Sequence, residues 1–563
     1  MSVSGVAGEL GWVRGRLSAW PGRGGCATLG VMKLFAAELN FRAIAEEFKL
    51  PERFPEDVHA EALQATDQHA DHRRDLRDIP FVTIDPAGSM DLDQAVNIQD
   101  APDAAGAGAG GDGAGDATDG AGDGAGANDA EGAARWRVLY AIADVAAFVD
   151  PAGPLMAESL QRGQTMYLPD EPTRLHPAEL SEGSASLLPD QTRPAVVWDI
   201  LLRADGEVAD FTVYRALIRS VKRFDYTEVE ADMHGGTLHP AIAQLPEVGR
   251  ARQRSDLRRK AINLRLPSIS VERTQSEDGT ERYLLGIDER QEMNDFNSEL
   301  SLLAGMCAGE MMVRAGVGIL RTLPPAGDKE IAAFDHSAHA LGFDRSGRPI
   351  GELLADIDAS TPRGMALMRD AQSLLRGAGY QQFGLAGVDA EAGESEPAGA
   401  GGADSEKPAG AAGAGEDAGA APSIHAGIGG HYAHVTAPLR RLVDRFATEI
   451  CLAIASSQPI PEWVTANVDQ VLGTMKSSSQ TASAVDRACL KLTEAVVLQP
   501  WVGQNFNATV LNSDGGDKAK ILVEEPPILT TCVGGPDEAS TVKVTLIEAE
   551  PAARKVRFAW PAD

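Results

Sequence analysis

Residues 83–95 read Thr-Ile-Asp-Pro-Ala-Gly-Ser-Met-Asp-Leu-Asp-Gln-Ala, and they form the most informative stretch of the chain. Within nine residues they place three carboxylates, Asp85, Asp91 and Asp93, around a Pro/Gly turn that follows an apolar strand. On an extended chain Asp91 and Asp93 point to the same side, because side chains alternate with a period of two. Carboxylates this close repel one another unless a hard cation such as Mg²⁺ or Mn²⁺ neutralises them. The motif therefore predicts a metal site, although its spacing alone is also typical of an acidic surface turn.

The chain around this motif mixes strand and helix patterns from about residue 75 to 485. Helical apolar spacing predicts helices over Met293–Val313 and Pro438–Ala455. Short apolar runs predict strands at Phe81–Ile84, Asp91–Ile98, Trp136–Ala143 and Val196–Leu202.

Both ends of the chain differ from this middle part. Residues 1–31 are Gly-rich without periodicity, and we expect them to be disordered or to precede a true start at Met32. Residues 32–74 show helical apolar spacing with a turn at Pro51–Pro55. In residues 504–563, short apolar runs alternate with turns, which is typical of a small five-stranded β-barrel. The runs are Ala508–Leu511, Ala519–Val523, Val542–Ile547 and Lys555–Ala559.

Two segments, 100–133 and 387–422, consist mostly of Gly, Ala, Pro and acidic residues. Such segments bury too little apolar surface to offset their ordering entropy, so we expect both to be disordered. The first lies between two predicted strands and is best explained as an expanded hairpin loop, since long insertions cost little closure entropy. The two segments contribute about half of the net charge of −31. The remainder is still acidic, which counts against a broad nucleic-acid-binding surface and leaves room only for a local basic channel.

The cysteine pattern and the hydropathy indicate a reducing compartment. The five cysteines are scattered, odd in number and without a C-x-x-C pair, which argues against a disulfide framework and a zinc site. No apolar run approaches the roughly 18 residues that a membrane span needs. The N-terminus lacks the continuous apolar stretch of a signal peptide. We therefore expect a cytoplasmic protein that does not enter a membrane.

Several blocks of the sequence, in the same order, resemble the RNB catalytic domain of the exoribonuclease II family. The first block runs from Arg74 to Asp93 and contains the acidic motif. The later blocks are residues 140–145, 167–169, 175–177, 180–193 and 431–444, and the resemblance covers about residues 75–500. It implies an α+β fold in which helices surround a mixed sheet. It also implies a monomeric, Mg²⁺-dependent 3′→5′ exoribonuclease that admits one RNA strand into a narrow channel and releases 5′-mononucleotides.

The resemblance also assigns roles to individual residues. Asp85, Asp91 and Asp93 would hold the metal and activate the attacking water, with Asp93 the most sensitive position. Tyr167 would stack on bases near the 3′ end, although a core tyrosine is the alternative. Glu299 would contact the terminal nucleotide, although it could equally be a helix-surface residue, and Asp486 would supply a further acid to the substrate site.

Arg440 has an independent physical argument. We expect Thr436 to cap a helix whose first turn contains Pro438 and Arg440. A cation there opposes the helix dipole, and a bound phosphate would resolve the conflict. Arg440 is thus interpreted as a phosphate clamp and Arg441 as its helper in substrate binding. The alternative is a surface Arg–Arg pair with a salt bridge from one of them to Asp444.

One position departs from the family pattern. The family usually has a fourth Asp directly after the third, whereas this chain has Gln94. A Gln carbonyl can be a fourth Mg²⁺ ligand, but it brings no negative charge, so metal affinity should be weaker. Nearby, His425, His431 and His434 fit no zinc spacing, and we expect them to be neutral or at the surface.

The ends of the chain also depart from the family. Family members commonly carry two cold-shock-type OB domains before the catalytic core, and the roughly 75 residues here cannot supply them. The C-terminal barrel has few basic or aromatic residues, so its grip on RNA should be weak.

Two rival functions remain open at this point. The first is a catalytically impaired RNA-binding protein of the same fold, which Gln94 and the acidic surface favour. The second is an interaction scaffold whose two acidic insertions recruit basic partners. The presence of all three acids together with Arg440 favours catalysis.

Overall fold

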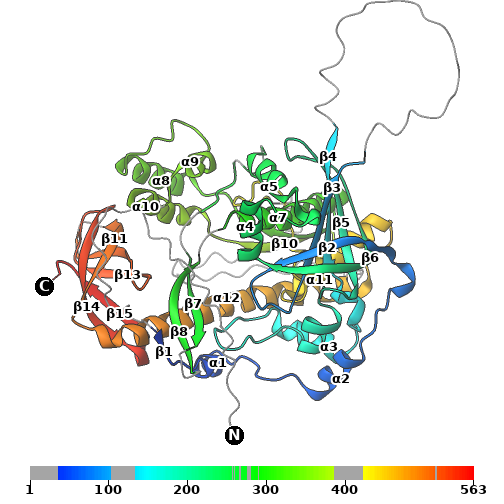
Figure 1. Ribbon diagram of the computed structural model, residues 1–563, viewed down its shortest axis with the longest axis horizontal. Helices are drawn as coiled ribbons and strands as arrows, with labels where there is room; N and C mark the ends of the chain where they lie inside the picture. The colour runs from blue at the N-terminus through cyan, green and yellow to red at the C-terminus, as the bar shows by residue number, and fades with distance from the viewer. Residues whose placement is uncertain are drawn as a thin grey trace, which may run out of the picture. The chain divides into compact units, whose positions relative to one another are not determined.

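The computed structural model describes residues 36–102, 133–255, 258, 260–264, 268–275, 280–288, 291–359, 361–385, 423–513 and 516–562. The predictions for residues 1–31 and for most of the two acidic insertions lie outside these ranges. Within them, strands and helices alternate along the chain in a mixed α+β fold (Figure 1), as expected. None of the described helices is both long and apolar enough to cross a bilayer.

A closed barrel of five strands forms the centre of the region that contains the acidic motif, in the order β2-β3-β4-β5-β6. Its strands are β2 (Arg74–Asp85), β3 (Gln94–Asp100), β4 (Ala134–Ala143), β5 (Thr192–Arg203) and β6 (Val208–Asp225). All neighbours pair antiparallel except β2 and β6, which pair parallel and close the barrel. Strands β3 and β4 pair in register from Gln94 opposite Ile142 to Asp100 opposite Trp136. The segment between them therefore connects a hairpin, as predicted.

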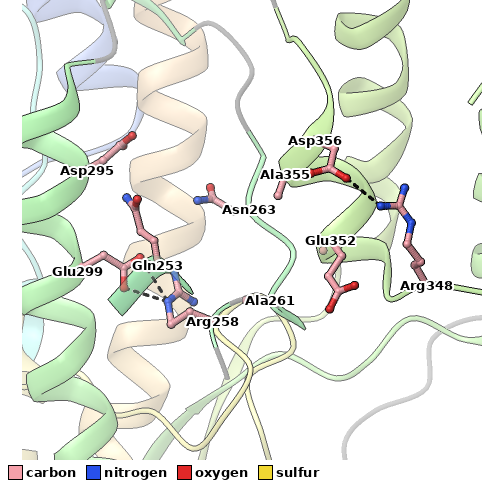
Figure 2. Close-up of a pocket in the computed structure, with 11 residues that line it drawn as sticks. Gln253, Arg258, Ala261, Asn263, Asp295, Glu299, Arg348, Glu352, Ala355 and Asp356 are labelled. Carbon is pink, nitrogen blue, oxygen red and sulfur yellow. Dashed lines mark hydrogen bonds and ion pairs between the residues drawn. The ribbon is translucent and has the colours of Figure 1, made fainter. Parts of the chain in front are cut away.

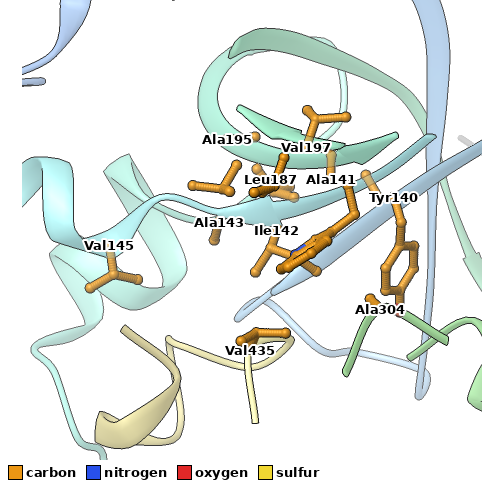
Figure 3. Close-up of a cluster of buried hydrophobic side chains, with 14 of the residues drawn as sticks. Tyr140, Ala141, Ile142, Ala143, Val145, Leu187, Ala195, Val197, Ala304 and Val435 are labelled. Carbon is orange, nitrogen blue, oxygen red and sulfur yellow. The ribbon is translucent and has the colours of Figure 1, made fainter. Parts of the chain in front are cut away.

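The apolar runs that predict these strands are buried almost completely. In β4, every side chain from Val138 to Ala143 is at most 2% exposed. Continuous burial on both faces is possible because the barrel lumen fills with side chains on one side and helices cover the other. Figure 3 shows this packing: Tyr140 of β4 lies beside Ala304, while Val435 lies below the strand.

The described helices are of very different lengths. They are α1 (Arg42–Glu47), α2 (Glu56–Gln64), α3 (Pro154–Arg162), α4 (Tyr226–Gly235), α5 (Leu245–Arg254), α7 (Glu292–Ala315), α8 (Asp328–Ala340), α9 (Ile350–Asp356), α10 (Pro362–Ala371), α11 (Leu442–Ser456) and α12 (Glu462–Leu498). Three of them, α8 to α10, form a hydrophobic cluster separate from the barrel core. The helix predicted at Met293–Val313 is confirmed as α7, and the helical region before residue 74 contains α1 and α2. The helix predicted from Pro438 begins four residues later, at Leu442.

A second closed barrel of five strands follows α12, in the order β11-β12-β13-β15-β14. Its strands are β11 (Asn505–Ser513), β12 (Lys518–Val523), β13 (Ile528–Val533), β14 (Thr541–Glu550) and β15 (Lys555–Ala559). Four of them match the predicted apolar runs. The fifth, β13, was not predicted because only Ile528 and Cys532 of its side chains are buried, so its apolar signal is short.

Two small sheets complete the described structure. One has the order β1-β8-β7 (Ala36–Ala37, Glu281–Asp288 and Ser268–Gln275), and the other pairs β10 (Gly379–Phe383) with β9 (Gly318–Thr322). The four described cysteines, Cys307, Cys451, Cys489 and Cys532, are buried free thiols. This agrees with the predicted lack of a disulfide framework among them.

Candidate active site

The acidic motif leaves the barrel at the end of β2. Asp85 is the last residue of that strand and pairs with Asp225 at the end of β6. The chain then turns at Gly88, whose φ of +85° is a conformation that glycine adopts without steric cost. Strand β3 begins only at Gln94, so the prediction that Asp91 starts a strand is wrong by three residues. Asp91 and Asp93 lie in a loop, and loop contacts set the directions of their side chains.

Two side chains far away in the sequence hold this loop. The Ser186 hydroxyl donates to the Met90 carbonyl over 2.6 Å and accepts from the Leu92 amide over 3.0 Å. The Arg223 guanidinium donates to the Ser89 carbonyl over 2.8 Å. Its positive charge also acts to lower the pKa of Asp85. Neither role was predicted, because a single Ser or a single strand Arg carries no signal in sequence.

Asp93 and Arg440 form the ion pair at the centre of the site. Asp93 is 3% exposed, and its Oδ2 lies 3.3 Å from Nε of Arg440. Its Oδ1 accepts from the Leu439 amide over 2.8 Å. Burial raises the pKa of Asp93 to about 8, although Arg440 opposes the shift. The Arg440 side chain is 46% exposed, so part of its guanidinium faces the open side of the site.

Asp85 and Asp91 border this ion pair. Burial raises the pKa of Asp85 to about 6, Arg440 lowers it, and Asp91 raises it. Oδ2 of Asp85 is buried and has no hydrogen-bond partner among the described residues. The Tyr167 hydroxyl donates to Oδ2 of Asp91 over 3.1 Å, while the Tyr167 side chain is 53% exposed. The alternative of a core tyrosine is therefore wrong.

The structure changes the argument for the two arginines. Helix α11 has Arg441 at its N-cap, so Thr436 does not cap it and Arg440 lies in a turn before the helix. Asp93, rather than a helix end, is the group that faces Arg440. Arg441 instead donates to both carboxylate oxygens of buried Asp444, over 2.8 and 2.7 Å. The salt bridge given above as the alternative is thus formed by Arg441.

Gln94 also lies at the site, and its amide group is engaged at both ends. Its Nε2 donates to the Thr436 carbonyl over 2.8 Å. Its Oε1 accepts from the hydroxyls of Tyr140 and Ser301. The role of Gln94 as a metal ligand stays a prediction.

Glu299 and Asp486 have different surroundings. Glu299 is 4% exposed, so the alternative that it lies on the helix surface is wrong. Figure 2 shows Glu299 on α7, turned toward Arg258 in a pocket of about 490 Å³. The two side chains are buried and ion-paired, with Nη2 of Arg258 3.0 Å from Oε1 of Glu299. Asp486 is exposed on α12. Contact of either residue with a nucleotide stays a prediction, and for Glu299 it would require a change of partner.

Tyr226 is a site residue that sequence reasoning missed. It begins α4 directly after β6, and its hydroxyl accepts from Nδ2 of Asn297 over 3.1 Å. Burial raises the pKa of the Tyr226 hydroxyl. The charge of Asp85 raises this pKa further, and the charge of Arg440 lowers it. Only the parallel pairing of β2 with β6 brings it beside Asp85, so no local sequence pattern could reveal it.

Two of the three histidines before Arg440 have a lowered pKa. His434 is half-buried, its Nδ1 lies 2.9 Å from the Tyr380 hydroxyl, and desolvation lowers its pKa well below the usual value. Burial also lowers the pKa of His425 to about 4. Both are therefore neutral at pH 7, as expected.

The donor chemistry of the site fits a hard divalent cation that has few protein ligands. Among the described residues, no three His, Cys, Asp or Glu side chains come close enough to share one ion. However, Asp85 has a buried oxygen without a partner, and Asp91 disfavours ionisation of both Asp85 and Asp93. A cation would relieve both conflicts. Mg²⁺ in particular is often held by one or two carboxylates together with substrate phosphates.

Family models match most of the chain. The RNB domain matches residues 73–454, and the RNase II-type exonuclease C-terminal S1 domain matches residues 504–560. The chain is 27% identical to ribonuclease R of Chlamydia pneumoniae over 325 residues, which are 56% of this chain and 43% of that protein. It is 25% identical to ribonuclease R of Escherichia coli over 334 residues, 56% of this chain and 37% of the relative. It thus spans less than half the length of these relatives.

Solved structures share the fold at low sequence identity. Mycoplasma genitalium RNase R in complex with ribose-methylated single-stranded RNA matches with a TM-score of 0.71 and 16% identity, over 92% of this chain and 77% of that one. Yeast Ssd1, a pseudonuclease, matches with a TM-score of 0.57 and 12% identity, over 86% of this chain and 54% of that one. With the RNB model covering more than half of its residues, and with the S1 barrel behind it, this chain belongs to the RNB family.

Proposed function

We propose that the chain is a hydrolytic 3′→5′ exoribonuclease, which degrades single-stranded RNA to 5′-mononucleotides by metal-assisted phosphodiester hydrolysis. The observation that supports it most directly is the Asp93–Arg440 ion pair, with Asp85 and Asp91 beside it. The three acids and the arginine come from two chain segments about 350 residues apart. They meet at one end of the β2–β6 barrel, where burial disfavours ionisation of both Asp85 and Asp93.

Arg440 is suited to bind the scissile phosphate. Its guanidinium uses Nε toward Asp93, and no other described residue bonds to its remaining N–H groups. A planar guanidinium with free donors binds phosphate oxygens in a bidentate way. Arg440 would thus stabilise the negative charge that builds up on the phosphate during hydrolysis.

The acids divide the remaining tasks. Asp85 and Asp91 would hold Mg²⁺ or Mn²⁺ through oxygens that have spare lone pairs. When bound, the ion lowers the pKa of a water molecule and neutralises charge on the phosphate. Asp93, held between the Leu439 amide and Arg440, would join the other two acids in holding the ion and activating the attacking water.

Tyr167 is suited to position the end of the strand. Its hydroxyl is fixed by Asp91 while about half of its surface remains open, so a base can stack on the ring. Stacking tolerates any base, which suits an enzyme without sequence preference. RNA is proposed as the substrate because the relatives are named ribonuclease R and one solved neighbour is in complex with single-stranded RNA. We propose that the enzyme acts as a monomer.

A catalytically impaired RNA-binding protein of the same fold is the second candidate. Gln94 in place of a fourth acid favours it, and the similarity to a pseudonuclease means that the fold by itself does not imply activity. An interaction scaffold based on the acidic insertions would require those insertions for function, whereas the enzyme retains turnover when both are deleted.

The test is an assay on 5′-labelled oligo(A) with a titration of Mg²⁺ and of Mn²⁺. Wild type should release mononucleotides, and Asp93→Asn should lower kcat by at least about 10²-fold. Asp75→Asn is the matched control, because Asp75 lies on β2, the strand that leads into the acidic motif, but is an exposed partner of Arg77. RNA binding without release of nucleotides by wild type would instead support the impaired protein.

A further inference from the structure

The carbonyl oxygen of Gln94 is already engaged by neighbouring hydroxyls. Oε1 of Gln94 lies within hydrogen-bond distance of the hydroxyls of Tyr140 and Ser301. The two hydroxyls also lie 2.7 Å apart, and since each has one proton, the three groups form a closed cluster in which at least one hydroxyl donates to Oε1. Tyr140 is 1% exposed and belongs to the packed core, which leaves it little freedom to withdraw. Ligation by Gln94 would have to break this cluster.

The surroundings of Nε2, the other end of the Gln94 amide, require a neutral hydrogen-bond donor. Nε2 donates to the carbonyl of Thr436, a residue that is 3% exposed. A carboxylate at this position would face that carbonyl oxygen with a negative charge and no hydrogen to donate. A carboxylate on a side chain of the same length would therefore be unfavourable in these surroundings, and the amide of Gln94 is the group that matches them.

Gln94 and its neighbour hold the two ends of one short segment. Gln94 binds the Thr436 carbonyl, and Asp93 binds the Leu439 amide, over 2.8 Å in each case. The segment between these points leads directly into Arg440. Further anchors are Asp444, which accepts from the Ala437 amide over 2.7 Å, and His176, which bonds to the Pro438 backbone.

We propose that Gln94 is a positioning residue: its neutral amide ties residues 436–439 to β3 and so keeps Arg440 against Asp93, instead of ligating the metal. The proposal rests on the proposed function only for its kinetic consequence. A misplacement of about 1 Å in a catalytic group can cost about 10²-fold in rate. Loss of the contact between Gln94 and Thr436 should therefore lower kcat.

Two variants test the tie without changing the size of the side chain. Gln94→Glu keeps an acceptor but loses the donor, and Gln94→Met loses both. Both should speed hydrogen exchange at residues 437–441, measured in EDTA without RNA. On oligo(A) both should lower kcat by between about 10-fold and 100-fold, with the half-saturating Mg²⁺ concentration unchanged. Gln99→Glu is the control, since Gln99 lies on β3 too but donates only to Asn97 in the same strand.

The opposite results are equally definite. If Gln94→Glu lowers the Mg²⁺ concentration needed for half-maximal rate and keeps kcat, Gln94 is a ligand and the proposal is wrong. Unchanged exchange at residues 437–441 in Gln94→Met would overturn it as well. If Gln94→Glu does not fold, Gln94→Met, which introduces no charge, decides the question. Inactive wild type would refute the proposed function, while the exchange comparison would still decide the role of Gln94.

Discussion

Arg440 and Arg441 are neighbours of the same type with different partners. Arg440 faces Asp93 and remains 46% exposed, whereas Arg441 is tied to buried Asp444 through two hydrogen bonds. At the scale of single residues, the protein thus separates a group that is available to substrate from one that holds the turn together.

Lysine substitutions should separate these roles. Arg440→Lys keeps the charge but loses the planar donors, so kcat on oligo(A) should fall by about 10² to 10³-fold with little change in thermal stability. Arg441→Lys should lower the melting temperature more than it lowers kcat at 25 °C. Equal losses of kcat in the two variants, at equal stability, would contradict the assignment.

Tyr167 should contribute to binding rather than to the chemical step. Tyr167→Ala should weaken RNA affinity by about 1–3 kcal/mol, the value of one base–aromatic stack. Tyr167→Phe keeps the ring and should bind nearly as well as wild type. Fluorescence anisotropy measures RNA affinity without turnover when all variants also carry Asp93→Asn. If Tyr167→Phe lost as much affinity as Tyr167→Ala, the effect would belong to the hydroxyl rather than to the ring.

At the scale of elements, a buried ion network connects the barrel to α11. Asp144, which follows β4, lies 2.8 Å from Arg73 before β2 and 2.8 Å from Arg215 of β6. Arg215 also pairs with Glu449 of α11. Although burial opposes its ionisation, Arg215 and Arg73 hold the pKa of Asp144 below its usual value. The helix that follows Arg440 is thereby fixed to the barrel that carries the acids.

Asp144→Asn should therefore destabilise the protein strongly. Removing one partner of a buried network leaves uncompensated charge, which costs about 3–5 kcal/mol. Asp199→Asn is a suitable control, because Asp199 pairs with the half-exposed Arg137 on the same barrel. Urea unfolding at pH 7 measures both, and similar midpoints for the two variants would argue against a network of this importance.

His176 gives a pH-dependent term in the same region. Burial lowers its pKa to about 3, and Arg445 of α11 adds to the effect. Between pH 6.5 and 3, His176 is protonated in the unfolded chain but neutral in the folded chain. The contribution of His176 to the free energy of unfolding is therefore fully present above pH 6.5 and is lost progressively as the pH falls toward 3. The difference in unfolding free energy between wild type and His176→Gln should change by about 1.4 kcal/mol per pH unit in this window, in favour of the variant at low pH. A difference independent of pH would contradict a neutral buried His176.

At the scale of the whole molecule, the charge balance is unfavourable for RNA. The net charge is −31, so affinity must come from local groups such as Arg440 and Tyr167 rather than from a broad basic surface. The S1 barrel has few aromatic residues to add stacking beyond the site.

Affinity should consequently depend little on RNA length and on salt. For single strands the slope of log K against log salt is about −0.7 per phosphate contact, and we expect a slope typical of only a few contacts. Binding of Asp93→Asn to oligomers of increasing length, at several salt concentrations, tests this. A steep rise of affinity with length would show that a longer surface takes part.

The sequence by itself determined most of the helices and strands and the family to which the chain belongs. Buried runs such as Val138–Ala143 are long and apolar enough to predict their strands. The acidic motif and Arg440 were sufficient to predict a candidate site, and the structure brings these residues together. The S1 barrel was also predictable, except for β13 with its two buried side chains.

Only the tertiary structure decided which groups face one another. Thr436 was expected to cap a helix and instead gives its carbonyl to Gln94, while Glu299 pairs with Arg258 and Tyr226 lies beside Asp85. Each of these contacts joins residues that are about 40 to 340 positions apart in the sequence. Each therefore depends on barrel closure and helix packing rather than on local spacing. Burial then sets the pKa values of Asp85 and Asp93, which no local pattern of residues can give.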